Sequence, residues 1–152
     1  MVISKGNNLI LTDRLLRSWL RCRRKAWLDC FADSTERLWT AHRTLHLDHQ
    51  YRCFRKLIPS KFAKGINACK AGEVGVVGLR MRGESSKGQL LNAQPHLLQR
   101  INGKSCWGNF AYRPVIARQG KKLLKENRLS IAMTGFLLSK LQQSNVNHGL
   151  AL

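Results

Sequence analysis

The amino-acid sequence predicts an α+β fold that consists of N-terminal helices, a three-stranded, mainly antiparallel sheet and a long C-terminal helix. Apolar residues recur at helical spacing through most of the first 72 residues. Runs of strand-forming residues, separated by turns that contain glycine, follow as far as residue 118, and a second helical pattern then begins. An order of helices, then strands, then a helix is typical of α+β domains.

The first helix is expected to begin after Thr12, whose hydroxyl can cap it, and to continue to Leu28. Trp19 and Trp27 occupy apolar positions of this pattern, so they are predicted to lie in the core rather than to form a base-stacking surface. The opposite face of this helix is basic and carries Arg14, Arg17, Arg21, Arg24 and Lys25.

Two further helices are expected to complete the helical part of the chain. Asp33 or Ser34 can cap the second helix, which ends before Pro59 because the residue before a proline disfavours helical backbone angles. The third helix covers residues 61–70, and Gly72 is the residue expected to end it.

Three strands are expected to follow the helices. The first covers residues 74–81. The second covers residues 89–100 and has Pro95 at an edge or a bulge, because proline cannot donate a hydrogen bond to a neighbouring strand. The Asn-Gly pair at 102–103 predicts a turn, and residues 110–118 form the third strand.

The last predicted helix spans residues 122–142. Its apolar side is predicted to hold Leu124, Leu129, Ala132, Phe136, Leu137 and Leu141. Residues 144–152 show no strand pattern and are predicted to form a flexible tail. The chain length fits a single domain, with a helical part at 1–72 and a β-β-β-α core at 73–143.

The chain is strongly basic. Its 152 residues include 27 Lys and Arg but only 8 Asp and Glu, which gives a formal net charge of +19. Residues 49–152 contain three of these acids, namely Glu73, Glu84 and Glu126. The shortage of carboxylates argues against enzymes that need several acidic groups. The positive charge favours polyanionic partners, nucleic acid before an anionic membrane surface.

The sequence also predicts a cytoplasmic location. It contains no apolar run of about 18 residues that would span a membrane, and its first residues lack the apolar core of a secretion signal. The five cysteines form no Cys-x-x-Cys pair, which fits reduced thiols better than disulfides or a zinc site.

Two groups of residues together form a recognisable pattern. The first group is Leu-Thr-Asp-Arg-Leu-Leu at 11–16 with Arg-Cys-Arg-Arg-Lys-Ala-Trp-Leu-Asp at 21–29. The second is Tyr-Arg-Pro-Val at 112–115 with Gly-Lys-Lys at 120–122. The two groups resemble the N-terminal portion of the RecB-like nucleases, a family of the PD-(D/E)XK superfamily, in the branch common in cyanobacteria. The resemblance implies a truncated nuclease domain with an incomplete restriction-endonuclease-like core, which a partner chain could complete.

The resemblance also implies a chemistry. Such nucleases hydrolyse phosphodiester bonds with Mg²⁺ or Mn²⁺, which prefer the oxygen ligands that two carboxylates provide. A helical histidine, an Asp after the second core strand and an Asp/Glu-x-Lys pair on the third strand form the family's site. The lysine stabilises negative charge or positions the attacking water.

In this sequence most of those positions are substituted. The helical histidine corresponds to His49, whereas the first Asp corresponds to His96. The acid and the lysine of the third strand correspond to Ile116 and Arg118. Isoleucine cannot bind a metal, and arginine differs from lysine in reach and does not deprotonate. Glu126 is the acid that could face the site from the last helix in place of the missing ligands.

Other candidate sites have simpler explanations. Cys22 occupies a position that binds an iron–sulfur cluster in relatives, but the other cysteines are scattered, so a buried thiol is the preferred interpretation and no cofactor is expected. His42, His46 and His49 share a helix face, where solvated side chains are preferred over metal ligands. The residues predicted to contact phosphates are Arg21, Arg23, Arg24, Lys25, Lys121, Lys122, Lys125 and Arg128.

Three functional hypotheses follow. The first is a catalytically impaired nuclease remnant that keeps at most nucleic-acid binding, with DNA as the expected partner. The second is an active divalent-metal-dependent DNA nuclease in which His49, His96 and Glu126 act as displaced ligands. The third is a nonfunctional gene fragment with one unfilled sheet edge.

Overall fold

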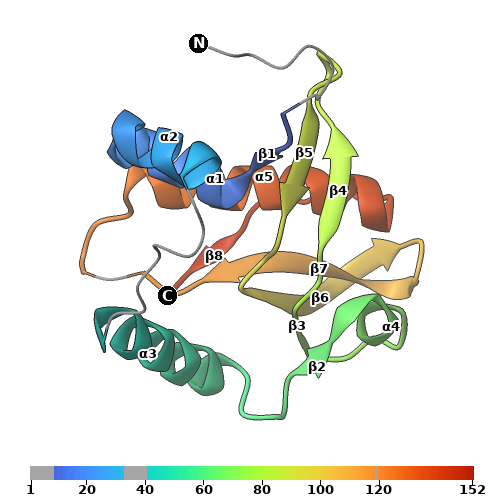
Figure 1. Ribbon diagram of the computed structural model, residues 1–152. Coiled ribbons are helices and arrows are strands. Elements are labelled where there is room, and N and C mark those ends of the chain that lie inside the picture. Colours follow the sequence, from blue (N-terminus) through green and yellow to red (C-terminus); the bar gives the residue numbers. More distant parts are fainter. Residues whose placement is uncertain (1–8, 33–40, 119) are drawn as a thin grey trace.

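The computed structural model describes residues 9–32, 41–118 and 120–152, without the side chains of residues 42 and 43. The α+β class is confirmed (Figure 1). In chain order the elements are β1 (Leu11–Thr12), α1 (Asp13–Arg21), α2 (Arg23–Phe31), α3 (Ala41–Leu57), β2 (Ala63–Lys64), α4 (Gly65–Lys70), β3 (Gly75–Val77), β4 (Met81–Glu84), β5 (Leu90–Ala93), β6 (Leu97–Ser105), β7 (Gly108–Ile116), α5 (Lys125–Gln142) and β8 (Leu150–Ala151).

The strands form two sheets rather than the one that was predicted. The smaller sheet has the order β1-β5-β4, with β1 parallel to β5 and β5 antiparallel to β4. The larger sheet has the order β2-β3-β6-β7-β8. Its central pairs β3-β6 and β6-β7 are antiparallel, and both outer pairs, β2-β3 and β7-β8, are parallel.

Each of the first two predicted strands is in fact two strands that belong to different sheets. Gly78, at a φ of +69°, separates β3 from β4, and Pro95 lies between β5 and β6. Glycine adopts this left-handed angle without strain, and proline interrupts a hydrogen-bond ladder. The predicted turn at 102–103 is wrong, because β6 passes through it with a register shift and the turn comes at Cys106 and Trp107.

The first predicted helix is also divided. The Thr12 cap is confirmed, since its hydroxyl accepts a hydrogen bond from the backbone N–H of Leu15 at 3.0 Å. The helix ends at Arg21, however, and Cys22 is extended. The chain then turns back as α2, and the hydroxyl of Ser18 donates to Asp29 at 2.6 Å, which joins the two helices.

The later helices agree only in part with the prediction. The expected cap of the second helix lies outside the described residues, and that helix ends at Leu57, before Pro59 as predicted. The expected third helix is shorter and follows the strand β2, and Gly72 succeeds it with a φ of +75°.

The core occupies both faces of the larger sheet. On one face Leu97 and Val115 pack against Phe54 and Ile58, so α3 covers this face. On the other face the core includes Leu98 and Tyr112 with residues of α4 and α5, which are Cys69, Met133, Leu137 and Leu138. Neighbouring side chains along a strand point to opposite faces, which is why Leu97 and Leu98 enter different parts of the core.

The predicted flexible tail is wrong in its last residues. Leu150 and Ala151 form β8, which pairs in parallel with Val115 and Ile116 of β7. The sheet edge that was expected to stay unfilled is therefore occupied by this chain. A two-residue strand carries too short a pattern to be found by alternation of apolar and polar residues.

Several apolar residues face the opposite way from the prediction. Trp19 and Trp27 are 50% and 59% exposed, so they are not core residues. On α5 the buried side holds Met133, Leu137 and Leu138, whereas Phe136 and the other predicted positions at 124, 132 and 141 are exposed. No helix among the described residues is long and apolar enough to cross a membrane.

Candidate functional site

Five cations and two histidines line a single pocket of about 510 Å³. Helices α1, α2, α3 and α5 contribute to this pocket, together with the bend before β6 and the end of β7. None of the described residues that line it is acidic. We call it the basic cleft, and we define it by Arg14, Arg17, Arg21, Lys25, His96 and Arg118.

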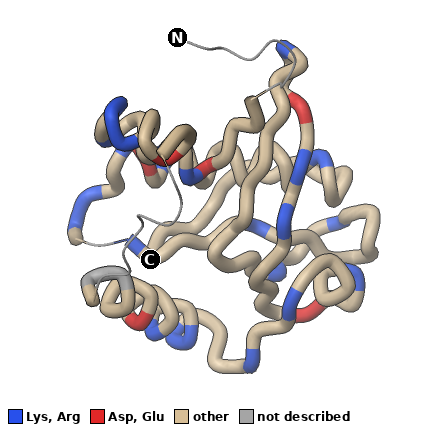
Figure 2. Tube along the Cα trace, viewed as in Figure 1, with Lys and Arg blue, Asp and Glu red and all other residues tan. Residues whose placement is uncertain are grey.

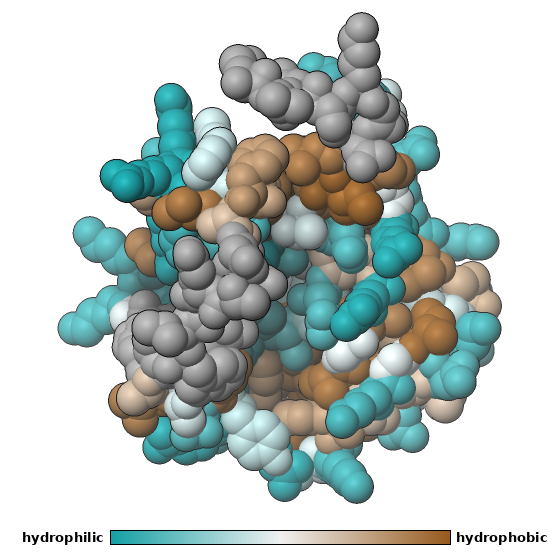
Figure 3. All heavy atoms as spheres, in the orientation of Figure 1, coloured by the Kyte–Doolittle hydropathy of each residue, from teal (hydrophilic) through white to brown (hydrophobic). Residues whose placement is uncertain are grey.

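A second pocket of about 910 Å³ adjoins the basic cleft. The two share Arg14, Arg17 and His96 as lining residues. The second pocket extends toward α3 and is lined there by apolar and aromatic side chains in addition to lysines. In Figure 3 hydrophilic residues occupy the middle of the face shown, between the upper helices and α3, and also much of its margin.

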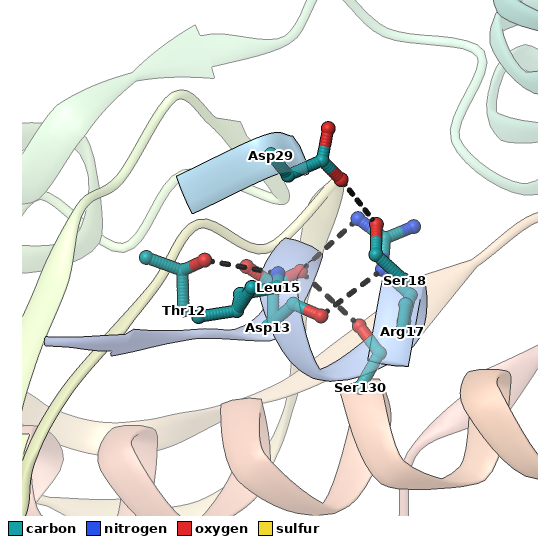
Figure 4. A network of polar contacts seen from close by, with 7 residues as sticks. All are labelled: Thr12, Asp13, Leu15, Arg17, Ser18, Asp29 and Ser130. Atoms are coloured by element: carbon teal, nitrogen blue, oxygen red, sulfur yellow. Dashed lines mark hydrogen bonds and ion pairs between the residues drawn. The ribbon is translucent and has the colours of Figure 1, made fainter. Parts of the chain in front are cut away.

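The arginines of α1 reach the cleft together because of their spacing. Arg14, Arg17 and Arg21 are three and four residues apart, which places them on one face of the helix. Asp13, in the first turn, is 8% exposed and binds Arg17 at 3.3 Å across one helical turn (Figure 4). The hydroxyl of Ser130 from α5 also lies 3.4 Å from the Asp13 carboxylate, so α1 is tied to α5 directly below the cleft.

Glu126 is bound to a cation. Its Oε1 accepts a hydrogen bond from Nε of Arg21 at 2.7 Å, and its side chain is 11% exposed. This hydrogen bond is the main reason why the pKa of Glu126 is lowered. The carboxylate that was predicted to replace a missing metal ligand is therefore ionised and paired with an arginine of the cleft.

His96 is neutral at physiological pH. Its pKa is lowered to about 4, chiefly by burial and in addition by the charges of Arg17 and His46, while Asp13 opposes them. Its Nδ1 is buried and makes no hydrogen bond within the described part of the chain. The imidazole consequently adds no charge to the cleft.

The three substituted positions of the resemblance lie together. His96, Ile116 and Arg118 line the same pocket, although His96 lies 20 positions before Ile116 in the sequence. Ile116 is 7% exposed at the end of β7, and the backbone N–H of Arg118 donates to the carbonyl of Leu152 at 2.9 Å. The guanidinium of Arg118 also donates to the carbonyl of Lys121, which holds it at the rim of the cleft.

His49 lies outside the basic cleft. Its Nε2 is 3.3 Å from the carbonyl oxygen of Arg118 and 3.6 Å from Sγ of Cys53. His46, one turn earlier on α3, lines the cleft with His96 instead. The side chain of His42 lies outside the described residues.

The remaining predicted contacts are exposed but not gathered at one place. Arg23 and Arg24 lie on α2, and the guanidinium of Arg23 is 5.3 Å from the ring of Trp19. The four basic residues at the start of α5 and just before it, which are Lys121, Lys122, Lys125 and Arg128, do not line the cleft. Figure 2 shows that Lys and Arg also occur on most other elements.

No metal centre is found in the part of the chain that the structure describes, since no group of three or more His, Cys, Asp or Glu side chains could hold an ion there. Cys22 is exposed at the junction of α1 and α2, and all five cysteines are free thiols. The expected burial of Cys22 is therefore wrong.

The sequence interpretation missed part of this site. Arg14 and Arg17 belong to the arginines of residues 14–25 that could contact phosphates, although the narrower set of predicted contacts leaves them out. The roles of Asp13 and His46 depend on packing between distant segments and left no signal in the sequence. No family model matches the chain, and no curated protein matches it either, so the resemblance to RecB-like nucleases rests on the quoted residues alone.

Proposed function

We propose that this chain is a RecB-like nuclease-type domain that has lost catalysis and binds nucleic acid, with DNA as the expected partner. One observation carries the proposal. The positions that correspond to the family's metal ligands and lysine are His96, Ile116 and Arg118, and they line a pocket with four further cations. Such a pocket attracts phosphate groups, yet among its described lining residues it has no carboxylate to hold Mg²⁺.

The chain topology supports the same proposal. A helix, three strands, a second helix and a fourth strand, here α3, β3, β6, β7, α5 and β8, follow the order of the superfamily core. The fourth strand is parallel to the third, and α5 connects them. The end of β7, where the family carries its acid and lysine, opens into the basic cleft.

Arginine is well suited to this role. Its planar guanidinium can donate two parallel hydrogen bonds to a phosphate and stays charged at every physiological pH. Three of the cleft arginines are on α1 and one follows β7, so they surround the pocket from two sides. A cytoplasmic location belongs to the proposal, and the five free thiols support it.

The proposal is tested by titrating labelled DNA with the protein while fluorescence anisotropy is recorded at several salt concentrations. About five phosphate contacts predict that affinity falls by roughly 10²- to 10³-fold between about 50 and 200 mM salt. No binding at low salt by folded protein would refute the proposal.

A cleavage assay with Mg²⁺ or Mn²⁺ distinguishes the proposed function from the alternative of an active nuclease. The proposal predicts intact DNA. Metal-dependent cleavage that disappears in the His96→Ala variant would show that displaced ligands form a working site. The proposal that the domain has lost catalysis would then be wrong.

A further inference from the structure

The pocket beside the basic cleft has a different chemistry from the cleft itself. Besides the shared residues it is lined by Tyr51, Phe54 and Phe62, and by the bend residues Gly78 and Pro95. Two lysines, Lys61 and Lys64, lie at its border. At about 910 Å³ it falls within the size range of small-molecule sites. We call it the aromatic pocket.

Tyr51 is the most exposed of the three aromatic side chains that line this pocket. It is 57% exposed, although aromatic rings of this size are usually buried for the most part. Its ring packs against Phe62 at a centroid distance of 5.9 Å and an interplanar angle of 79°. This edge-to-face contact fixes the orientation of the ring and leaves most of its surface open.

The polar groups of the aromatic pocket suit a nucleobase. Gln94 is exposed and lines the pocket, and an amide side chain can both donate and accept hydrogen bonds at a base edge. Asp48 lies on α3 three residues before Tyr51, where a carboxylate repels phosphate but can accept a hydrogen bond from an exocyclic amine. The phosphate is therefore expected at the Arg14 and Arg17 end, and the base is expected at the Tyr51 end.

We propose that the aromatic pocket holds an unpaired nucleobase, stacked on Tyr51, of a single-stranded nucleic acid whose phosphates lie in the basic cleft. This inference rests on the proposed function and adds the substrate class to it. A base in a duplex has both faces covered by its neighbours and its edge paired, so it cannot enter such a pocket without leaving the stack. Proteins that bind single-stranded nucleic acid combine a basic groove for the backbone with aromatic side chains on which the bases stack.

The test compares single-stranded and duplex oligonucleotides of one sequence with the wild-type protein and three variants. Tyr51→Ala is expected to weaken single-strand binding by between about fivefold and 150-fold and to leave duplex binding unchanged. Tyr51→Phe keeps the stacking surface and should bind like the wild type. Trp27→Ala is the matched control, since Trp27 is 59% exposed and lines neither pocket.

Other results would overturn the inference in recognisable ways. If the wild type binds single strands but Tyr51→Ala binds them equally well, the pocket is not a base site, while the proposed function stands. Loss of binding in Trp27→Ala alone would assign stacking to α2. Displacement of the strand by an equal concentration of a free nucleoside monophosphate would assign the pocket to a small molecule. If the folded wild type binds neither form, the proposed function itself fails.

Discussion

Nε of Arg21 lies 2.7 Å from Oε1 of Glu126, although the two residues are 105 positions apart in the chain. The contact joins α1 to the first turn of α5 at the border of the basic cleft. Glu126 is one of three acids after residue 48, and the hydrogen bond from Arg21 lowers its pKa. The acid that could have replaced a metal ligand thus stabilises an arginine.

Replacing this acid tests which role it has. In Glu126→Gln we expect a loss of about 1 kcal/mol in the free energy of unfolding, since the pair is partly exposed. Affinity for DNA should stay equal or rise, because a negative charge beside the cleft disappears. Denaturant unfolding and anisotropy titrations measure the two effects. A severalfold loss of DNA affinity without unfolding would contradict the account.

The partly buried imidazole of His96 predicts a pH dependence of stability. Its pKa is lowered to about 4 in the folded chain, against 6.5 for the unperturbed group. Between these two pH values the unfolded chain binds the proton more readily than the folded chain. The contribution of His96 to the free energy of unfolding is therefore complete above pH 6.5 and is lost as the pH falls toward 4. The loss amounts to about 3 kcal/mol at most.

The His96→Asn variant should show a flatter profile between pH 7 and pH 5 in denaturant unfolding. His148→Asn serves as the control, since His148 is exposed and lines neither the cleft nor the aromatic pocket. If the free energy of unfolding falls equally steeply with decreasing pH in the wild type and in His96→Asn, His96 is not responsible for the pH dependence.

Gln142 should contribute strongly to stability. It is fully buried, and its amide accepts from the backbone N–H of Tyr112 at 2.9 Å and donates to the carbonyl of Tyr112 at 3.3 Å. The Gln142 side chain thereby provides backbone hydrogen-bond partners at a position of β7 that the short strand β8 does not reach. Gln142→Leu leaves both backbone groups buried without a partner, so we expect about 2–4 kcal/mol of destabilisation. Gln143→Leu, at the exposed neighbouring position, should change stability little in the same unfolding experiment.

Gly149 leads the chain into β8 and has no room for a side chain. A methyl group there would overlap the side chain of Ile131 and come within 3.2 Å of the carbonyl oxygen of Pro114. Gly149→Ala should therefore lower the midpoint of thermal unfolding, by an amount that corresponds to about 1–3 kcal/mol. Asn147→Ala, at an exposed position in the same segment, is the control. An unchanged midpoint for Gly149→Ala would argue against the close packing of β8 on α5.

The sequence was sufficient for local features. Thr12 could be identified as a cap because a hydroxyl before a helical pattern acts within one turn, and the third strand and last helix were long enough to show their periods. The division of the chain between two sheets at Gly78 and Pro95 was not predictable. It depends on which strands pair, and neither residue specifies that.

Helical spacing placed Arg14, Arg17 and Arg21 on one face, whereas His96, Ile116 and Arg118 were grouped only through the resemblance. The sequence spacing of His96, Ile116 and Arg118 gives no reason to assign them to one site. They share a pocket because β6 pairs with β7. The apolar pattern misassigned Trp19 and Trp27, because α1 and α2 fold back on each other at Cys22. No proline or glycine marks that break, and the Ser18–Asp29 hydrogen bond that joins the two helices is not a sequence pattern.

The central claim is that the basic cleft binds the phosphates of nucleic acid. The most direct measurement compares DNA affinity at about 100 mM salt in two charge-reversal variants. Arg14→Glu/Arg118→Glu changes the cleft, whereas Lys87→Glu/Lys104→Glu makes the same change in net charge at exposed positions outside it. The account predicts that the cleft variant loses at least about tenfold more affinity than the control variant, with both proteins folded. Equal losses in the two variants would show that binding follows net charge alone and would contradict the account.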